Sequence, residues 1–118
     1  MNKILIVDDN AGILDVLQLL FSSEGFDVKC IADPAKTDAS VLEYKPDLIL
    51  LDVQLGTYDG RDICKELKHN ENTRHIPIIM MSASHNLHSM REKHCDADDF
   101  IAKPFDIDEI STKVITLI

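Results

Sequence analysis

Ile4-Leu5-Ile6-Val7-Asp8-Asp9-Asn10 and Leu48-Ile49-Leu50-Leu51-Asp52 are the stretches that decide the fold of this chain. In each stretch four apolar residues follow one another without a polar residue between them, and an aspartate comes directly after. Central strands of a parallel sheet show this pattern because helices cover both of their faces. The two stretches therefore predict neighbouring central strands that end in acidic side chains.

The rest of the chain repeats the alternation of a short strand and an amphipathic helix. Strands are predicted at Lys3–Val7, Asp27–Ile31, Leu48–Leu51, Ile76–Met81 and Asp99–Ala102, and helices at 11–23, 35–44, 60–69, 87–94 and 106–117. The second and fifth strands are more polar, which suits the edges of a sheet. With right-handed crossovers these units predict an α/β fold, a doubly wound five-stranded parallel sheet of order 2-1-3-4-5, flavodoxin-like (βα)5.

Length and composition restrict the class of protein. The 118 residues, 45% of them hydrophobic, suit one domain over residues 1–118. A net charge of −9 disfavours direct binding to a nucleic acid. No apolar run is long enough for a membrane span and no signal peptide is recognisable, so we expect a cytoplasmic protein. Cys30, Cys64 and Cys95 lack the spacing of a disulfide framework or zinc site, and we expect reduced thiols without a role in function.

Three carboxylates are predicted to meet at one edge of the sheet. Asp8 and Asp9 follow the first strand and Asp52 follows the third, and these strand ends lie together where the winding of the sheet reverses. Like charges this close raise one another's pKa unless a cation lies among them. Oxygen ligands in an open site suit Mg²⁺. The alternative for Asp9 is to cap the following helix, which Asn10 could do equally well.

Ser82 and Lys103 follow the fourth and fifth strands and are expected at the same edge. Each has an ordinary structural explanation, a turn or helix cap for Ser82 and a solvated side chain for Lys103. Beside an acidic site that holds a metal ion, however, a hydroxyl and an ammonium are groups that bind a phosphoryl group. Pro104 is a residue type well suited to the first position of a helix, and the bond before it is a candidate for the cis form.

Taken together, these residues resemble the receiver domains of two-component response regulators, single-domain chemotaxis regulators included. The resemblance covers nearly the whole chain and rests on the following segments in this order: Ile4–Asn10, Leu50–Val53, Asp59-Gly60, Ser82-Ala83 and Ala97–Phe105. Each segment alone is a weak signal. Their order and distances together make the resemblance specific.

The functional residues of the family can be carried over to the matching positions. The phosphoacceptor corresponds to Asp52, and the lysine that pairs with the phosphoryl oxygens corresponds to Lys103. Ser82 corresponds to the switch hydroxyl, which also contacts the phosphoryl group, and Phe100 to the switch aromatic. The resemblance implies Mg²⁺ as the cofactor, held by these ligands: Asp8, Asp9, Asp52 and the backbone carbonyl of Gln54.

The resemblance implies a role in phosphorelay signal transduction and not in the turnover of a separate substrate. A histidine kinase or a histidine phosphotransfer domain would donate a phosphoryl group to Asp52, and slow autodephosphorylation would remove it. The surface formed by the fourth helix, the fifth strand and the fifth helix would change in response. That surface would regulate a downstream protein or a tethered output domain, and a homodimer could form through it.

Some positions near the predicted pocket differ from the family or vary within it. Gly56 stands where receivers usually have proline, which predicts a more flexible loop after Asp52. Asp96 stands where glycine is common, at a position that favours a left-handed backbone. Gln54 and Ser84 are expected to flank the pocket and to set the lifetime of the phosphorylated form.

Three alternatives belong to other functional classes. A haloacid-dehalogenase-like phosphohydrolase carries Asp-x-Asp after its first strand, whereas this chain has Asn10 at the second acidic position and no room for a cap domain. A flavodoxin-like cofactor binder has a phosphate loop rich in Ser, Thr and Gly, unlike residues 9–13 here. A pseudo-receiver that only binds partners would not need the complete set of acids, serine and lysine.

Overall fold

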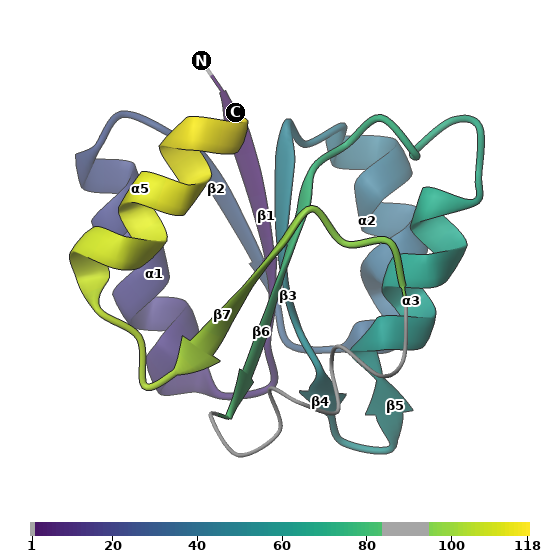
Figure 1. Cartoon of the computed structure of the whole chain (residues 1–118), viewed down its shortest axis with the longest axis horizontal. Coiled ribbons are helices and arrows are strands. Elements are labelled where there is room, and N and C mark those ends of the chain that lie inside the picture. Colours follow the sequence, from purple (N-terminus) through teal and green to yellow (C-terminus); the bar gives the residue numbers. More distant parts are fainter. Residues whose placement is uncertain (1, 84–94) are drawn as a thin grey trace.

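A parallel five-stranded sheet forms the centre of the computed structural model, which describes residues 2–83 and 95–118. Its strands lie in the order β2-β1-β3-β6-β7 (Figure 1). Their bounds are β1 Lys3–Val7, β2 Asp27–Ile31, β3 Leu48–Asp52, β6 Ile78–Ala83 and β7 Asp99–Lys103. Each pairing between neighbours is parallel. The predicted α/β fold and the order 2-1-3-4-5 are confirmed, with the two more polar strands at the edges.

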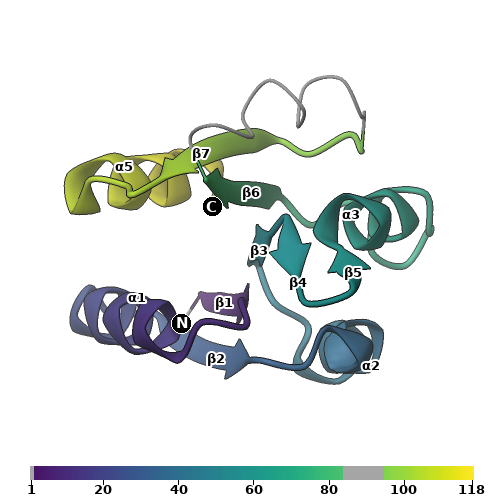
Figure 2. The same ribbon diagram turned by 90° about the horizontal axis from the view of Figure 1, so that it is seen from below.

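Helices cover both faces of this sheet. Helices α1 (Ala11–Ser23) and α5 (Ile107–Leu117) lie on one face, and α2 (Thr37–Tyr44) and α3 (Gly60–Lys68) lie on the other (Figures 1 and 2). Successive residues of a strand point to opposite faces. Ile4 and Ile6 accordingly pack with α1 and α5, whereas Leu5 and Val7 pack with α2 and α3. An uninterrupted apolar run is therefore what a strand between two helical layers requires.

The structure corrects several predicted boundaries. Strand β6 begins at Ile78, not at Ile76, and a 3₁₀ turn, η1 (Pro34–Lys36), precedes α2 where one helix was expected. Helix α5 begins at Ile107, because the side chain of Asp106 accepts a hydrogen bond from the Asp108 N–H and caps it. Pro104 therefore lies before the helix and does not begin it. The Lys103–Pro104 bond is cis, as considered from the sequence.

The segment after β3 contains an unpredicted hairpin. Strands β4 (Gln54–Leu55) and β5 (Tyr58–Asp59) pair antiparallel. Two residues per strand are too few to show a periodicity of two, so these strands could not be predicted from the sequence. The predicted helix at 87–94 and Ser84 lie outside the described residues.

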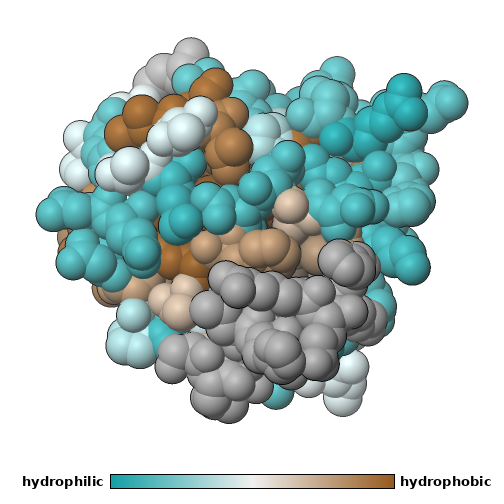
Figure 3. Space-filling model, viewed as in Figure 1, coloured by the Kyte–Doolittle hydropathy of each residue, from teal (hydrophilic) through white to brown (hydrophobic). Residues whose placement is uncertain are grey.

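The described residues on the face of the molecule that Figure 3 draws are largely polar. Figure 3 shows apolar side chains gathered mainly where α5 lies in this view. Ile107 and Ile115 on that helix are 51% and 58% exposed. No described helix combines the length and the apolar character that a membrane crossing demands.

Gly60 fixes the start of α3 against the end of β3. Its N–H donates a hydrogen bond to the Val53 carbonyl over 2.7 Å. A Cβ at this position would lie only 1.9 Å from the Asp52 carbonyl oxygen, so no larger residue fits without moving the backbone. The glycine thus allows the helix to approach the strand end that carries Asp52.

Replacing Gly60 with alanine should lower the free energy of unfolding by about 1–3 kcal/mol, the range for forcing extra volume into a packed site. Urea unfolding measures this difference. Gly12→Ala in α1 is the control, because its new Cβ would meet only the side-chain oxygen of Asn10, at 3.2 Å. If Gly60→Ala costs no more than Gly12→Ala, the close approach of α3 and β3 is not the constraint inferred here.

Candidate functional site

The carboxylates of Asp8, Asp9 and Asp52 lie together where β1 and β3 end side by side. One oxygen from each lies within 4.8 Å of the others, close enough for all three to hold a single metal ion. Asp8 is fully buried and Asp52 is 5% exposed, whereas Asp9 is exposed. The strand ends meet at the edge that Figure 2 views from below. The convergence predicted from the two apolar runs is present in the structure.

Lys103 reaches this cluster from the end of β7. Its Nζ lies 2.7 Å from Asp8 Oδ2 and 3.4 Å from Asp52 Oδ1. The ammonium is therefore shared between two carboxylates from two other strands. Among the described residues that line the pocket, three carboxylates face one ammonium, which leaves an excess of negative charge for a cation to neutralise.

The electrostatic environment acts on Asp52. Burial raises its pKa to about 6, and the charge of Asp8 acts in the same direction, while Lys103 opposes both. Desolvation and a neighbouring like charge both disfavour an ionised carboxylate. The direction of this shift is that expected for an acidic cluster before a cation is bound.

Ser82 brings a hydroxyl to the same pocket from the end of β6. The side chain is 2% exposed, and its Oγ has no hydrogen-bond partner among the described residues. A buried polar atom without a partner loses its hydrogen bonds to water and gains nothing in return. The Ser82 hydroxyl is thus available to a group that enters the pocket.

Two backbone N–H groups that contact the acids, those of Asn10 and Gly56, were not predicted from the sequence. The Asn10 N–H donates to Asp8 Oδ1 over 2.9 Å, and the Asn10 side chain caps α1, which resolves the choice between Asp9 and Asn10. The Gly56 N–H donates to Asp9 Oδ2 over 3.2 Å. Gly56 has a φ of 63°, which proline cannot adopt. The only feature of the sequence that pointed to the contact of Gly56 with Asp9 was a glycine shortly after a strand that ends in aspartate.

The pocket has a volume of about 410 Å³ and opens to solvent. Its lining brings together residues from four segments of the chain: Asp8, Asp9, Asn10, Asp52, Gln54, Gly56, Ser82, Ala83 and Lys103. Phe100 is not part of this lining. It lies on β7 and packs against the apolar cluster on the α2 and α3 face of the sheet. Six of the seven residues assigned from the resemblance thus line one pocket, and the seventh, Phe100, packs in the apolar cluster.

The pocket places the carboxylate of Asp52 beside the ammonium of Lys103 and the hydroxyl of Ser82, and only this hydroxyl lacks a hydrogen-bond partner among the described residues. A carboxylate is a nucleophile when ionised and needs no general base. The ammonium and the hydroxyl are donors suited to an anionic group rich in oxygen atoms. Once a cation offsets the excess negative charge, the pocket can hold such a group next to Asp52.

Comparison with known proteins places the chain among signalling proteins. A sequence profile described as response regulator receiver domain matches residues 4–115. The chain is 35% identical over its whole length to the DNA-binding dual master transcriptional regulator RpaA of Synechocystis sp., of which it covers 49%. Over 95% of its length it is 34% identical to the DNA-binding response regulator MtrA of Mycobacterium tuberculosis, of which it covers 48%. It therefore spans about half the length of these curated relatives.

Solved structures of receiver domains superpose on most of the chain. The receiver domain of sensor histidine kinase PA1611 from Pseudomonas aeruginosa, solved with a magnesium ion coordinated in its active site cleft, has a TM-score of 0.88 at 30% identity and covers 98% of this chain and 96% of its own. The receiver domain of a signal transduction histidine kinase from Syntrophus aciditrophicus has a TM-score of 0.91 at 28% identity, with 99% and 89% covered. The chain belongs to the response regulator receiver domain family, whose members are phosphoacceptor modules of two-component signalling and not classical enzymes.

Proposed function

We propose that this receiver accepts a phosphoryl group on Asp52 and transmits the event through a change in its surface. The position of Asp52 carries the proposal: its carboxylate is nearly buried, 3.4 Å from the Lys103 ammonium and within ligand distance of two further acids. The unpartnered hydroxyl of Ser82 lines the same pocket. A structural aspartate would not need this surrounding set of groups.

The acid cluster fits a divalent cation. Its donors are hard carboxylate oxygens in an open pocket, the ligand type that Mg²⁺ binds while it keeps several waters. Asp8, Asp9 and Asp52 would hold the ion together with the backbone carbonyl of Gln54, which lines the pocket. When bound, Mg²⁺ supplies positive charge that offsets the charge of the acids and of the phosphoryl oxygens.

The chain's own residues perform the remaining steps. An ionised Asp52 oxygen attacks phosphorus, a new O–P bond forms, and the N–P bond of a phosphohistidine breaks. Lys103 holds its positive charge beside the attacking carboxylate and next to the negative charge that spreads over the phosphoryl oxygens. The Ser82 hydroxyl then donates a hydrogen bond to one of those oxygens. Catalysis in this scheme is positioning and charge neutralisation.

Partners follow from this chemistry. The donor we infer is a phosphohistidine on a histidine kinase or a histidine phosphotransfer domain. The output we infer is a downstream protein or a tethered domain that contacts the surface around β7 and α5. Two of the relatives are DNA-binding regulators of about twice this length, which is consistent with an output domain beyond the receiver region.

Acetyl phosphate together with Mg²⁺ should add one phosphoryl group to the protein, at Asp52, because this carboxylate is the nucleophile. Intact-mass analysis and mapping of the acid-labile label check the number and the position. EDTA and Asp52→Asn should each abolish the label, whereas Asp38→Asn on the exposed side of α2 should retain it. Labelling that persists in Asp52→Asn would assign the phosphoacceptor to another residue.

Asp52→Asn should unfold less readily than the wild type at pH 7 in the absence of divalent cations. The pKa of Asp52 is raised from 3.8 to about 6 on folding, so the folded form binds a proton more tightly than the unfolded form. The free energy of unfolding of the wild type therefore falls as the pH rises from about 4 to about 6, and above pH 6 the full cost of ionising the buried carboxylate applies. Asparagine does not titrate, so the advantage of the variant should shrink towards pH 4.

Urea unfolding of both proteins over a pH series measures this difference. Glu43→Gln, which removes an exposed carboxylate of α2, is the control and should show no gain of this kind at neutral pH. A constant difference between Asp52→Asn and the wild type at all pH values would contradict the raised pKa.

Ser82→Ala should still accept the phosphoryl group, because Asp52, Lys103 and the metal ligands remain. The variant loses a hydrogen bond made only after phosphorylation, worth about 0.5–1.5 kcal/mol, which is a few-fold to about tenfold in the balance between two conformations. Amide NMR shifts around Phe100 should therefore move less on phosphorylation than in the wild type. Loss of phosphorylation would place Ser82 in the catalytic set, and a full response at Phe100 would exclude it from the switch.

A further inference from the structure

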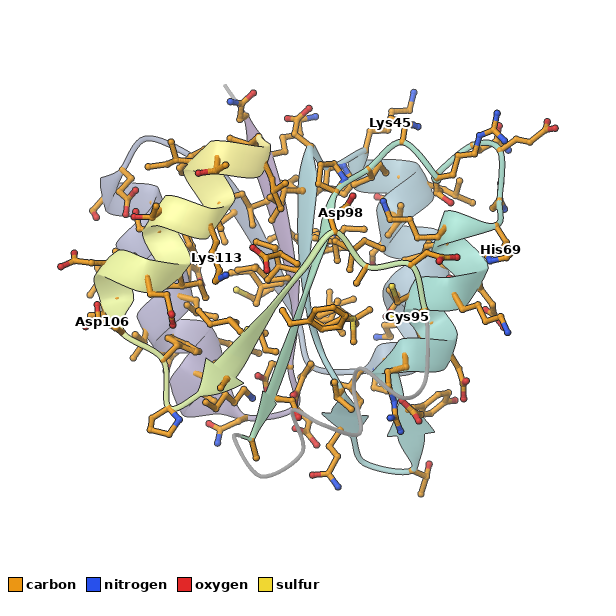
Figure 4. The ribbon with its side chains drawn as sticks, in the orientation of Figure 1. Lys45, His69, Cys95, Asp98, Asp106 and Lys113 are labelled. Carbon is orange, nitrogen blue, oxygen red and sulfur yellow. The ribbon has the colours of Figure 1, made fainter. Side chains whose placement is uncertain are left out.

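Two cysteines that are 31 positions apart meet in the apolar cluster beneath α3. The thiol of Cys64, on that helix, donates a hydrogen bond to the Cys95 carbonyl oxygen, with a distance of 3.2 Å from Sγ. Cys64 is fully buried and Cys95 is 2% exposed. Figure 4 shows Cys95 beside α3, on the segment that leads into β7. The contact therefore joins two segments that the sheet does not pair.

The two thiols are chemically unequal. A hydrogen bond between the two thiol side chains lowers the pKa of Cys95, and the Ala97 N–H and the positive charge of Arg61 act in the same direction, against burial and the charge of Asp96. This contact between the thiols, together with burial, raises the pKa of Cys64. One thiol of the pair is thus the better nucleophile, and the other retains its proton.

Side chains of α3 hold the Cys95 segment in place. His69 Nε2 lies 3.1 Å from Asp96 Oδ2, and Lys68 Nζ lies 2.7 Å from Asp98 Oδ2. Asp98 Oδ2 also accepts a hydrogen bond from the Ile78 N–H over 2.8 Å. The residues on the carboxyl side of Cys95 are therefore held against the same helix that carries Cys64, whose sulfur lies 3.2 Å from the Cys95 carbonyl oxygen.

We propose that Cys64 and Cys95 form a modification site, a dithiol that a small hydroperoxide converts into an intramolecular disulfide and that thiol reductants restore. The Cys95 thiolate attacks one oxygen of hydrogen peroxide, the O–O bond breaks, and a sulfenic acid and hydroxide form. The Cys64 sulfur then attacks the Cys95 sulfur, the S–O bond breaks, and water leaves with the Cys64 proton. Two thiols are oxidised by two electrons, and one peroxide is reduced to water.

The burial of Cys64 and Cys95 limits which oxidants can reach them and favours a disulfide as the product. Thiols with this little exposure exclude bulky disulfides but not a molecule the size of hydrogen peroxide. A sulfenic acid on Cys95 forms next to Cys64, so it has a resolving thiol at hand before further oxidation. The bond would tie α3 to the segment that leads into the strand carrying Phe100 and Lys103. The site is independent of the proposed phosphorylation, since it uses no residue of the acidic pocket.

The third cysteine provides an internal control. Cys30 lies half-buried on β2, and its thiol points to the Leu14 carbonyl oxygen at 3.8 Å. Burial and the charge of Asp15 raise its pKa, which slows its reaction with peroxide. The chain thus carries one thiol that should remain free when the other two react.

The test exposes the folded, metal-free protein to hydrogen peroxide, alkylates the remaining thiols after acid quenching, and maps the peptides by mass spectrometry without reduction. The expected product has lost two hydrogen atoms, contains a peptide cross-linked through Cys64 and Cys95, and retains one alkylated thiol, at Cys30. A small reducing thiol should restore three alkylated positions. Cys30→Ser should give the same cross-link, and Cys64→Ser should give none.

Because Cys64 is a core residue, the wild-type and Cys30→Ser maps decide the outcome even if Cys64→Ser unfolds. Three free thiols after exposure of folded protein, a sulfinic acid on Cys95 beside a free Cys64, or a cross-link through Cys30 would each overturn the proposal. None of these results depends on phosphorylation of Asp52, so the two proposals fail separately.

Discussion

The fully buried carboxylate of Asp8 depends on the ammonium of Lys103. A buried charge without a partner is strongly destabilising, and here the partner lies 95 positions further along the chain. The contact forms only if β7 joins the sheet in the observed register, with Lys103 opposite Ala83 at the end of β6. The register of β6 against β3, with Met81 opposite Asp52, brings Ser82 to the same pocket. One ion pair thus connects the order of the strands with the chemistry at their ends.

Strand β7 connects this pocket to both halves of the core. Phe100 points to the face covered by α2 and α3, whereas Ile101 packs on the face of α1 and α5. Asp99 meets Lys113 of α5, with 3.0 Å between Oδ2 and Nζ, and Figure 4 shows Lys113 reaching from its helix towards the strand. A displacement of Lys103 at the end of β7 would therefore affect the packing on both faces of the sheet, because successive side chains of β7 point to opposite faces.

The parts of the fold that were predictable are those with a repeated pattern. Ile4–Val7 and Leu48–Leu51 predicted central strands because burial on both faces removes every polar residue, and their aspartates located the pocket. The hairpin at Gln54–Leu55 and Tyr58–Asp59 was not predictable, because two-residue strands have no period. The contact of Cys64 with Cys95 could not be predicted from the spacing of the cysteines in the sequence, because tertiary packing alone brings the two residues together. The last helix was predicted from residue 106 and begins at Ile107, because the side chain of Asp106 caps it.

The hydrogen bond from the Gly56 N–H to Asp9 affects how strongly the pocket can bind a cation. A freely rotating aspartate loses side-chain entropy when it becomes a ligand. Here one oxygen of Asp9 is already held by the loop that follows β3, so part of that entropy is lost during folding and not during binding. Preorganisation of this kind strengthens binding without any additional charge. The backbone shape of a glycine loop, together with the three acids, would thus contribute to the affinity for the cation that we propose at this site.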